Sequence, residues 1–207
     1  MSAVRTNLIT KSDLVGMVPN FSANINTDGF THANDFANER LRGLLPTAMW
    51  TNLGLVYNAS AWSGATAYVV GNYVLYQSRV FISIQNGTNK NPLTETAYWT
   101  EKELYSVFRD YLKPFLCWQA YAKYLPFADL FPSQGGVKMH VSLNTEQAPS
   151  DKLAIAISNA QSTADTYFMN FNKYMGDALN IVDGVTYNFS EDGIRTFKPK
   201  LKIKMIK

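Results

Sequence analysis

The side chains that could do chemistry in this 207-residue chain are few and scattered. Its two histidines, His32 and His140, lie in polar sequence, and neither has a carboxylate or second histidine at metal-ligand spacing on the same element. The single cysteine, Cys117, precedes Trp118 in an apolar stretch, where a small buried hydrophobe is the expected role. These residues predict no metal site, no cofactor and no intrachain disulfide.

The carboxylates and glycines also give little sign of catalysis. Glu101 with Glu103, and Glu191 with Asp192, are typical of helix starts and turns rather than of a glycosidase pair. Gly135-Gly136 lacks the strand, helix and Lys-Ser/Thr ending of a phosphate-binding loop. We therefore expect a protein that is not an enzyme. A cell-wall hydrolase remains an alternative, because the fold could join two carboxylates that are distant in the sequence.

Basic residues are concentrated at the C-terminal end of the chain. The formal net charge is only +3, too small to indicate a nucleic-acid binder as a whole. The last residues alternate between apolar and basic, which is typical of an edge strand. Such a strand could be solvated, pair with a neighbouring subunit's sheet, or lie against DNA phosphates. The candidate inter-subunit arm comprises Lys200, Leu201, Lys202, Ile203, Lys204 and Met205.

Two long stretches with helical spacing of apolar residues form the centre of the chain. Residues 101–131 and 150–175 each carry a stripe with steps of three and four residues, which predicts two helices that face each other. Pro114 predicts either a kink or a helix that restarts with this proline in its first turn. The candidate helix-packing residues are Phe108, Phe115, Trp118 and Phe171.

Before the first of these two stretches, the spacing of apolar residues changes from helical to alternating. Residues 62–99 contain short strand-like runs separated by turn residues, including a Gln77-Ser78 turn. This stretch resembles the small chitin-binding modules of the type 5/12 carbohydrate-binding class. The resemblance implies a module whose aromatic residues form its core or present rings to a sugar. The candidate glycan- or protein-docking aromatics are Trp62, Tyr68, Tyr76, Phe81 and Trp99.

The remaining elements complete the predicted fold. Thr10 and Asp13 predict the start of a short helix, and Thr27 or Asp28 begins a helix that ends near Pro46. The predicted fold class is α+β, mainly α: a helical bundle with a small antiparallel β insertion and an extended C-terminal β arm. The predicted domains are a helical one (1–56 and 101–180), an inserted aromatic module (57–100) and a Lys-rich arm (181–207). We expect no signal peptide and no membrane-spanning run.

With the insertion set aside, the chain resembles the helical head–tail adaptor proteins of tailed bacteriophages, in particular the ring proteins of crAss-like phages. The resemblance covers residues 8–56 and 101–180 and is carried by loose, mainly apolar motifs at 9–14, 36–45, 111–116, 124–127 and 160–174. It implies a homo-oligomeric, usually dodecameric ring docked to the portal around the DNA channel, and no catalysis. The β insertion and the Lys-rich end depart from the family pattern.

These observations lead to one expected function and one further alternative. The expected function is a structural virion protein of the head-to-tail connector, present at the head–tail junction and, during assembly, in the host cytoplasm. Its partners would be other copies of itself, the portal, neighbouring connector or tail proteins and, without sequence specificity, phage DNA. No membrane partner is expected. The alternative is a carbohydrate-binding virion decoration or tail protein that uses the aromatic module.

Overall fold

The structure is a computed structural model that describes residues 7–19, 27–128, 131–133, 136–138 and 150–189. The helices are α1 (Lys11–Met17), α2 (Thr27–Arg42), α3 (Thr47–Tyr57), α4 (Glu103–Val107), α5 (Lys113–Ala128) and α6 (Ser150–Asp177), with a π-helical turn (Phe108–Leu112) between α4 and α5. The strands are β1 (Ser60–Ala61), β2 (Ala67–Tyr68), β3 (Tyr73–Tyr76), β4 (Arg79–Ser83), β5 (Gly87–Thr88), β6 (Trp99–Glu101), β7 (Phe131–Ser133), β8 (Gly136–Lys138), β9 (Ile181–Val182) and β10 (Val185–Thr186). The predicted α+β, mainly α class is confirmed.

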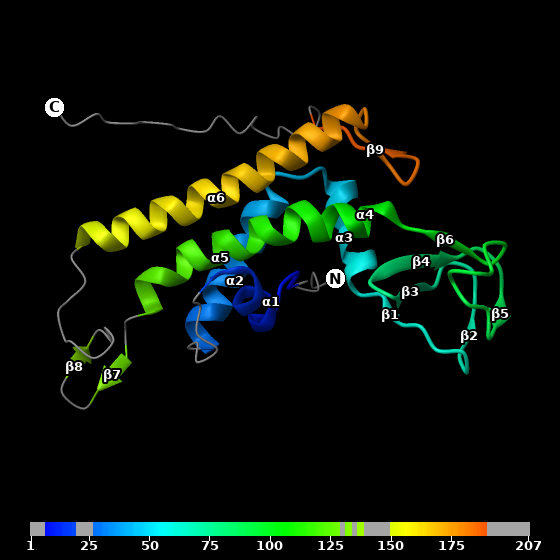
Figure 1. Ribbon diagram of the computed structural model, residues 1–207, viewed down its shortest axis with the longest axis horizontal. Coiled ribbons are helices and arrows are strands. Elements are labelled where there is room, and N and C mark those ends of the chain that lie inside the picture. Colours follow the sequence, from blue (N-terminus) through cyan, green and yellow to red (C-terminus); the bar gives the residue numbers. More distant parts are fainter. Residues whose placement is uncertain (1–6, 20–26, 129–130, 134–135, 139–149, 190–207) are drawn as a thin grey trace.

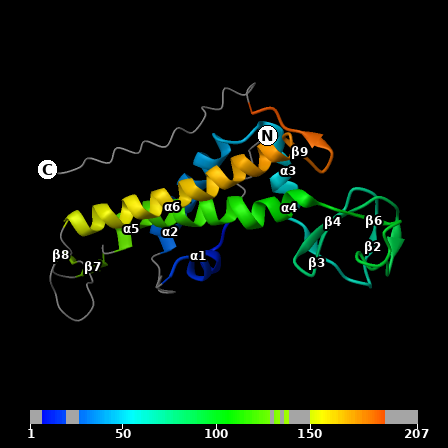
Figure 2. The ribbon, with the colours of Figure 1, turned by 45° about the horizontal axis from the view of Figure 1, so that its top comes forward.

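Helices α5 and α6 run side by side along the length of the molecule, as the sequence predicted (Figures 1 and 2). Helices α1 and α2 also pack against α5, and α3 packs against α4. Helix α5 is buried against both α2 and α6, so its apolar surface is wider than one stripe. Each large side chain that is fully buried there contributes roughly 1.5–3 kcal/mol. The fully buried side chains of the main core include Leu41, Met49, Leu53, Leu104, Leu112, Phe115, Leu116 and Phe171.

The π-helical turn accommodates Pro114. Proline has no N–H, and in a regular helix its ring would clash with the carbonyl of the residue four positions earlier. Immediately before the proline, the N–H of Lys113 donates to the carbonyl of Phe108, five residues back. The wider turn changes the path of the helix just before the ring, and α5 restarts at Lys113. Of the two predicted outcomes, the restart with Pro114 in the first turn is the one observed.

The β module lies at one end of the long helices (Figure 1). Its main sheet has the order β1-β3-β4-β6, and its centre is the β3–β4 hairpin, which turns at Gln77-Ser78 as predicted. Both turn residues have positive φ, the backbone of the tight hairpin turns that match strand twist. One detail of the prediction is wrong: the sheet is mixed rather than antiparallel, because β1 pairs with β3 in parallel.

Strand β4 connects two hydrophobic cores. Successive side chains of a strand point to opposite faces, and Val80 accordingly belongs to the main helical core while Phe81 belongs to a second cluster inside the module. That second cluster also buries Tyr68, Val74 and Trp99. The module therefore has a small core of its own and is also attached to the helices through one face of its sheet.

Two polar devices hold the N-terminal segment in place. The Thr10 hydroxyl accepts a hydrogen bond from the N–H of Asp13, whose carboxylate accepts from the N–H of Thr10; this reciprocal capping box confirms the predicted start of α1. Buried Asn34 donates to the carbonyl of Ile9 at 3.1 Å. Asn38 accepts from the N–H of Leu8 at 3.2 Å. These two α2 amides thus satisfy main-chain groups that would otherwise be buried without partners.

The stretch predicted as the start of a C-terminal arm is, at least as far as residue 189, part of the body. Strands β9 and β10 form a hairpin after α6, and Val182 and Tyr187 are buried in the main core. The Tyr187 hydroxyl accepts a hydrogen bond from the Asn52 side chain at 3.0 Å, and Phe189 contacts Phe171 edge-on. An arm that is free of the body can therefore begin only beyond residue 189.

Candidate functional site

The predicted helix-packing residues lie at the centre of the molecule. Phe108, Phe115 and Phe171 are buried, and Phe115 contacts Phe168 of α6 with 5.2 Å between ring centroids. Trp118 is only half-buried, and its ring meets Tyr121 edge-on. Three of the four residues therefore act inside the protomer, and Trp118 alone offers part of its ring to another molecule.

The five candidate docking aromatics do not form a flat platform. Tyr68, Phe81 and Trp99 are buried in the core of the β module, where Tyr68 and Trp99 pack edge-on. Trp62 and Tyr76 are half-buried, and their rings meet at an interplanar angle of 66°. Pyranose recognition by stacking needs an exposed ring face. These five side chains are placed to build the module rather than to present parallel ring faces to a glycan.

The remaining predicted residues have three outcomes. The candidate arm, Lys200, Leu201, Lys202, Ile203, Lys204 and Met205, lies outside the described residues, as does His140. His32 is exposed on α2. Cys117 is buried, and burial raises the pKa of its thiol to about 12, so the reactive thiolate is scarce at neutral pH. Among the described residues, no three histidine, cysteine or acidic side chains are grouped so that they could hold a metal ion.

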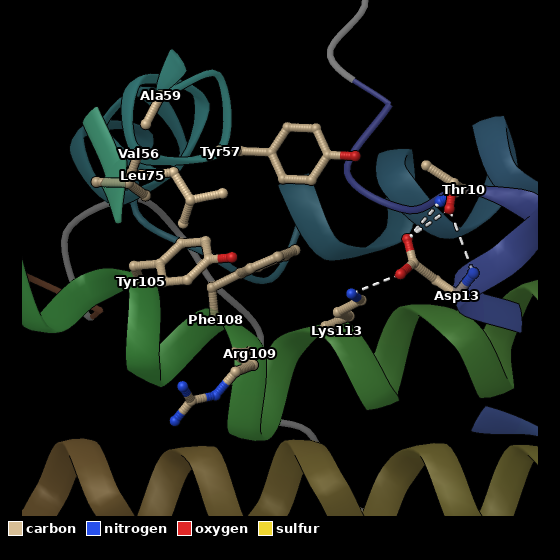
Figure 3. Close-up of a pocket in the computed structure, with 10 residues that line it drawn as sticks. All are labelled: Thr10, Asp13, Val56, Tyr57, Ala59, Leu75, Tyr105, Phe108, Arg109 and Lys113. Atoms are coloured by element: carbon tan, nitrogen blue, oxygen red, sulfur yellow. Dashed lines mark hydrogen bonds and ion pairs between the residues drawn. The ribbon is translucent and has the colours of Figure 1, made fainter. Parts of the chain in front are cut away.

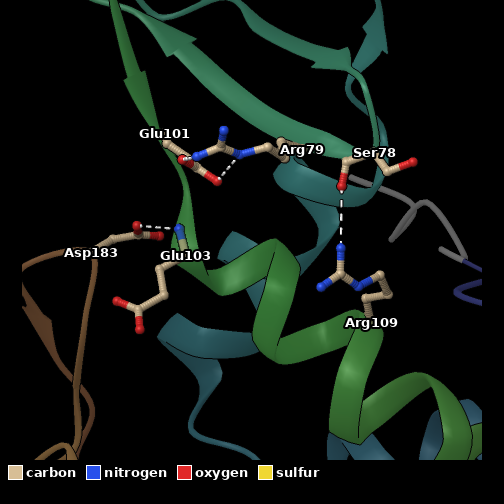
Figure 4. A network of polar contacts seen from close by, with 6 residues as sticks. All are labelled: Ser78, Arg79, Glu101, Glu103, Arg109 and Asp183. Atoms are coloured by element: carbon tan, nitrogen blue, oxygen red, sulfur yellow. Dashed lines mark hydrogen bonds and ion pairs between the residues drawn. The ribbon is translucent and has the colours of Figure 1, made fainter. Parts of the chain in front are cut away.

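A polar network connects the helical body, the β module and the β9–β10 hairpin (Figure 4). Arg79 on β4 pairs with Glu101 on β6 through two hydrogen bonds. Arg109 on the π-helical turn pairs with its neighbour Asp110 and reaches the carbonyl of Ser78 at 3.4 Å. The first pair joins two strands of the module, and the bond from Arg109 to Ser78 joins the module to the π-helical turn.

The hairpin is part of the same network. The carboxylate of Asp183, in the β9–β10 turn, accepts hydrogen bonds from the N–H groups of Glu103 and Leu104 at the start of α4. The Glu103 carboxylate in turn accepts from the hydroxyl of Tyr174 on α6. Burial and this hydrogen bond to Glu103 both raise the pKa of Tyr174, so its hydroxyl remains a donor at neutral pH. The hairpin is therefore held rigidly at this end of the long helices.

A cavity of about 290 Å³ lies where α1, α3 and α4 meet the β module (Figure 3). Its apolar lining includes Val56, Leu75 and Phe108, and its polar lining includes Tyr57 and Tyr105. The ring of Tyr57 meets Phe108 edge-on at 5.7 Å. Burial, reinforced by the nearby Asp13 carboxylate, raises the pKa of Tyr57 and keeps its hydroxyl protonated.

Two of the charged groups that line this cavity, Lys113 and Asp13, pair with each other. Lys113 Nζ lies 2.5 Å from Asp13 Oδ1, and the other carboxylate oxygen caps α1. Burial alone would raise the pKa of Asp13, but its bonds to Lys113 and Thr10 outweigh that effect and lower it. Among the described residues that line the cavity, no nucleophile is paired with a base. The cavity therefore offers hydrogen-bonding groups and apolar contact.

Large apolar side chains are exposed at the end of the molecule that carries the β module and the hairpin, and the sequence analysis did not identify them. Val69, Val70 and Ile84 are exposed on two loops of the module; the N–H of Gly71, after Val70, donates to the carbonyl of Ser83, before Ile84. On the hairpin, Leu179, Ile181 and Val185 are exposed. The only signal for the second group was Asp183-Gly184, a typical hairpin turn between short apolar runs.

Comparison with known proteins gives one match. A model described as a family of unknown function, DUF6712, matches residues 69–181, which is more than half of the chain and extends from the β module through α6. No curated protein and no solved structure matches the chain. Within the described parts of the chain, no helix combines the length and apolarity needed to cross a lipid bilayer.

Proposed function

Because the chain belongs to the DUF6712 family, whose description assigns no function, we propose from its residues and structure that it is a structural virion protein of a tailed bacteriophage. In this proposal it is one subunit of a homo-oligomeric connector ring that docks to the portal at the head–tail junction, around the DNA channel. Assembly takes place in the host cytoplasm. The C-terminal basic residues, which lie outside the described region, would contact a neighbouring subunit or DNA without sequence specificity.

The observation that carries this proposal is that two elements at one end of the helical body, the β module and the β9–β10 hairpin, each expose three large apolar side chains (Figure 1). Monomeric proteins rarely leave several large apolar residues exposed together, and such patches commonly mark protein–protein contacts. Here they occur on two elements, Val69, Val70 and Ile84 on the module and Leu179, Ile181 and Val185 on the hairpin. The polar network of Asp183, Glu103 and Tyr174 holds the hairpin rigidly, so little conformational entropy is lost on binding.

The arrangement of the aromatic residues favours protein docking over the carbohydrate-binding alternative. Tyr68, Phe81 and Trp99 are buried in the module's core. Trp62 and Tyr76 are neither coplanar nor fully exposed. What the module exposes instead is aliphatic: Val69, Val70 and Ile84. Aliphatic side chains suit an apolar protein surface rather than the polar hydroxyls of a sugar.

The test is co-assembly with the portal protein encoded by the same phage genome. The purified chain is mixed with the assembled portal, and the mass of the complex is measured by light scattering, followed by imaging of the particles. We expect a ring of many copies stacked on the portal. Binding should weaken when Val70 or Ile84 is replaced by serine if the module faces the portal. A chain that neither binds portal nor enters connector particles would refute the proposed function.

A further inference from the structure

Leu179, the second residue after the end of helix α6, combines two unfavourable features. Leu179 has φ of +52°, a left-handed conformation that costs free energy for any side chain other than glycine, and it is 76% exposed. The N–H of Leu179 donates to the carbonyl of Gly176, and that of Asn180 to the carbonyl of Met175. These two bonds are the helix-ending pattern in which glycine normally occupies the position of Leu179. At this exposure, the side chain recovers little of that cost by packing against the described part of its own chain.

Leu179 is one of three exposed apolar residues on a short, rigid protrusion. The β9–β10 hairpin also exposes Ile181 and Val185, while Val182 on its other face is buried in the main core. The exposed carboxylate of Asp177 lies two residues before Leu179, whereas that of Asp183 is engaged with the start of α4. The protrusion is therefore apolar with one acidic group beside Leu179, and a complementary surface would be a groove with apolar walls and a basic group at its rim.

Such a groove lies toward the other end of the long helices. A cavity of about 330 Å³ between α2, α5 and α6 has walls formed by Phe36, Ala122, Pro126 and Ile157. Phe36 is itself exposed, although it is large and apolar. Among the described residues that line this cavity, the only charged one is Lys123, whose ammonium group lies 4.9 Å from the centre of the Phe36 ring.

The lining of this groove also contains a donor without a partner. Gln119 is 1% exposed; its Oε1 accepts a hydrogen bond from Arg40 at 2.8 Å, and this bond fixes which end of the amide is which. Its Nε2 is buried and has no hydrogen-bond partner among the described residues. A buried N–H without an acceptor is costly, so a ligand that brings an oxygen atom into the groove would gain free energy there.

We propose that the β9–β10 hairpin of one copy of this chain inserts Leu179 into the groove between α2, α5 and α6 of the next copy. The apolar side chains of the hairpin would pack against Phe36 and Ile157, the Asp177 carboxylate would face Lys123, and a hairpin oxygen would accept from Gln119 Nε2. Protrusion and groove are different surfaces, so the contact is head-to-tail, the type that generates closed rings when the rotation closes. This contact rests on the proposed ring-forming role and identifies the surfaces that would carry it.

The two surfaces of one molecule cannot meet each other. Ile157 in the groove and the hairpin are separated by most of the length of α6, roughly 30 Å at the helical rise per residue. A contact between them is therefore intermolecular. This separation makes the proposal testable with paired variants, one on each surface.

The experiment measures self-association of the full chain by sedimentation velocity over a range of concentrations. Leu179→Gly should weaken self-association at least tenfold, while its melting temperature stays equal to or above that of the wild type because glycine relieves the positive φ. Phe36→Gln should weaken self-association similarly. The matched control is Met169→Gln. It changes an exposed apolar residue of α6 that lies outside both surfaces, and it should leave self-association unchanged.

Mixing the variants provides the decisive measurement. A Leu179→Gly chain keeps an intact groove, and a Phe36→Gln chain keeps an intact hairpin, so an equimolar mixture should form dimers that do not extend. The double variant Phe36→Cys/Leu179→Cys should give disulfide-linked oligomers under oxidation, because the native Cys117 is buried. A mixture that remains monomeric, or single variants that associate like the wild type, would overturn the inference.

The failure of this inference can be told apart from failure of the proposed function. A wild-type chain that stays monomeric at every concentration overturns the hairpin-in-groove contact, whether or not the chain docks to the portal. Conversely, a chain that associates through these surfaces but never binds a portal retains the contact and contradicts the connector role.

Discussion

Asp183 caps the helix that begins at Glu103: its Oδ1 atom accepts the main-chain N–H of Glu103 at 2.7 Å. The second carboxylate oxygen accepts from the N–H of Leu104. Two of the N–H groups that a helix start leaves without partners are thus satisfied by a residue far away in the sequence. The hairpin that carries the exposed Leu179 is therefore fastened to the helix that follows the β module.

Replacing Asp183 by alanine should destabilise the protein by about 1–3 kcal/mol. The change removes a cap, typically worth about 1 kcal/mol, and puts a β-carbon without a polar group at φ of +55°. Urea unfolding followed by circular dichroism measures the loss. Asp183→Asn is the matched control, since asparagine keeps an acceptor oxygen and tolerates positive φ. A negligible loss for Asp183→Ala would show that the cap contributes little.

Asp13 should make the stability of the protein depend on acid pH. Its pKa in the folded protein is lowered from the ordinary value of 3.8, so its contribution is fully present above that value and is lost as the pH falls through the lower, folded-state pKa. In Asp13→Asn, the stability difference from the wild type should be largest near neutral pH and shrink in acid. Melting temperatures between neutral pH and the acid limit of folding test this. A difference that is constant with pH would contradict the assignment.

The two tryptophans of the β module should respond differently to the same substitution. Trp99 Nε1 donates to the carbonyl of Lys90 at 2.9 Å, whereas the buried Trp62 Nε1 has no partner among the described residues. Trp99→Phe loses a hydrogen bond and leaves a carbonyl unpaired, so it should cost about 1–3 kcal/mol more than Trp62→Phe. Each variant is the other's control in denaturant unfolding. A larger cost for Trp62→Phe would indicate that the Trp62 N–H does have a hydrogen-bond partner, one outside the described residues.

Local patterns in the sequence predicted much of this fold. Thr10 and Asp13 form the expected cap, Gln77-Ser78 forms the expected turn, and the two long helical stretches face each other. The cap of α1 and the Gln77-Ser78 turn depend only on neighbouring residues, which is why these two predictions succeed. Sequence patterns failed where burial depends on more than one packing partner. Helix α5 packs against both α2 and α6, so Leu116, which lies outside the predicted stripe, is fully buried, while Trp118, which lies in it, is not.

The candidate contact surfaces could not be predicted in the same way. The pairing of Asp183 with Glu103, and of Arg79 with Glu101, depends on how distant segments are brought together. The exposure of Leu179 depends on where α6 ends, and the cost of its backbone conformation is visible only in φ. An apolar residue in a short apolar run is normally assigned to the core. The structure is needed to recognise that this one points outward.

The basic C-terminal residues, which lie outside the described region, give the last prediction. Deleting residues 198–207 should weaken ring or portal assembly and leave the helical body folded, because the described core ends with Tyr187 and Phe189. Circular dichroism and the melting temperature report folding, and light scattering reports assembly.

Replacing Lys200, Lys202 and Lys204 by glutamine should weaken assembly if these lysines contact DNA phosphates, and the difference from the wild type should then be smaller at high salt. Replacing Leu201, Ile203 and Met205 by serine should weaken assembly if the segment pairs with a neighbouring subunit's sheet. Unaltered assembly by the deletion variant would count against any role of the segment in the ring.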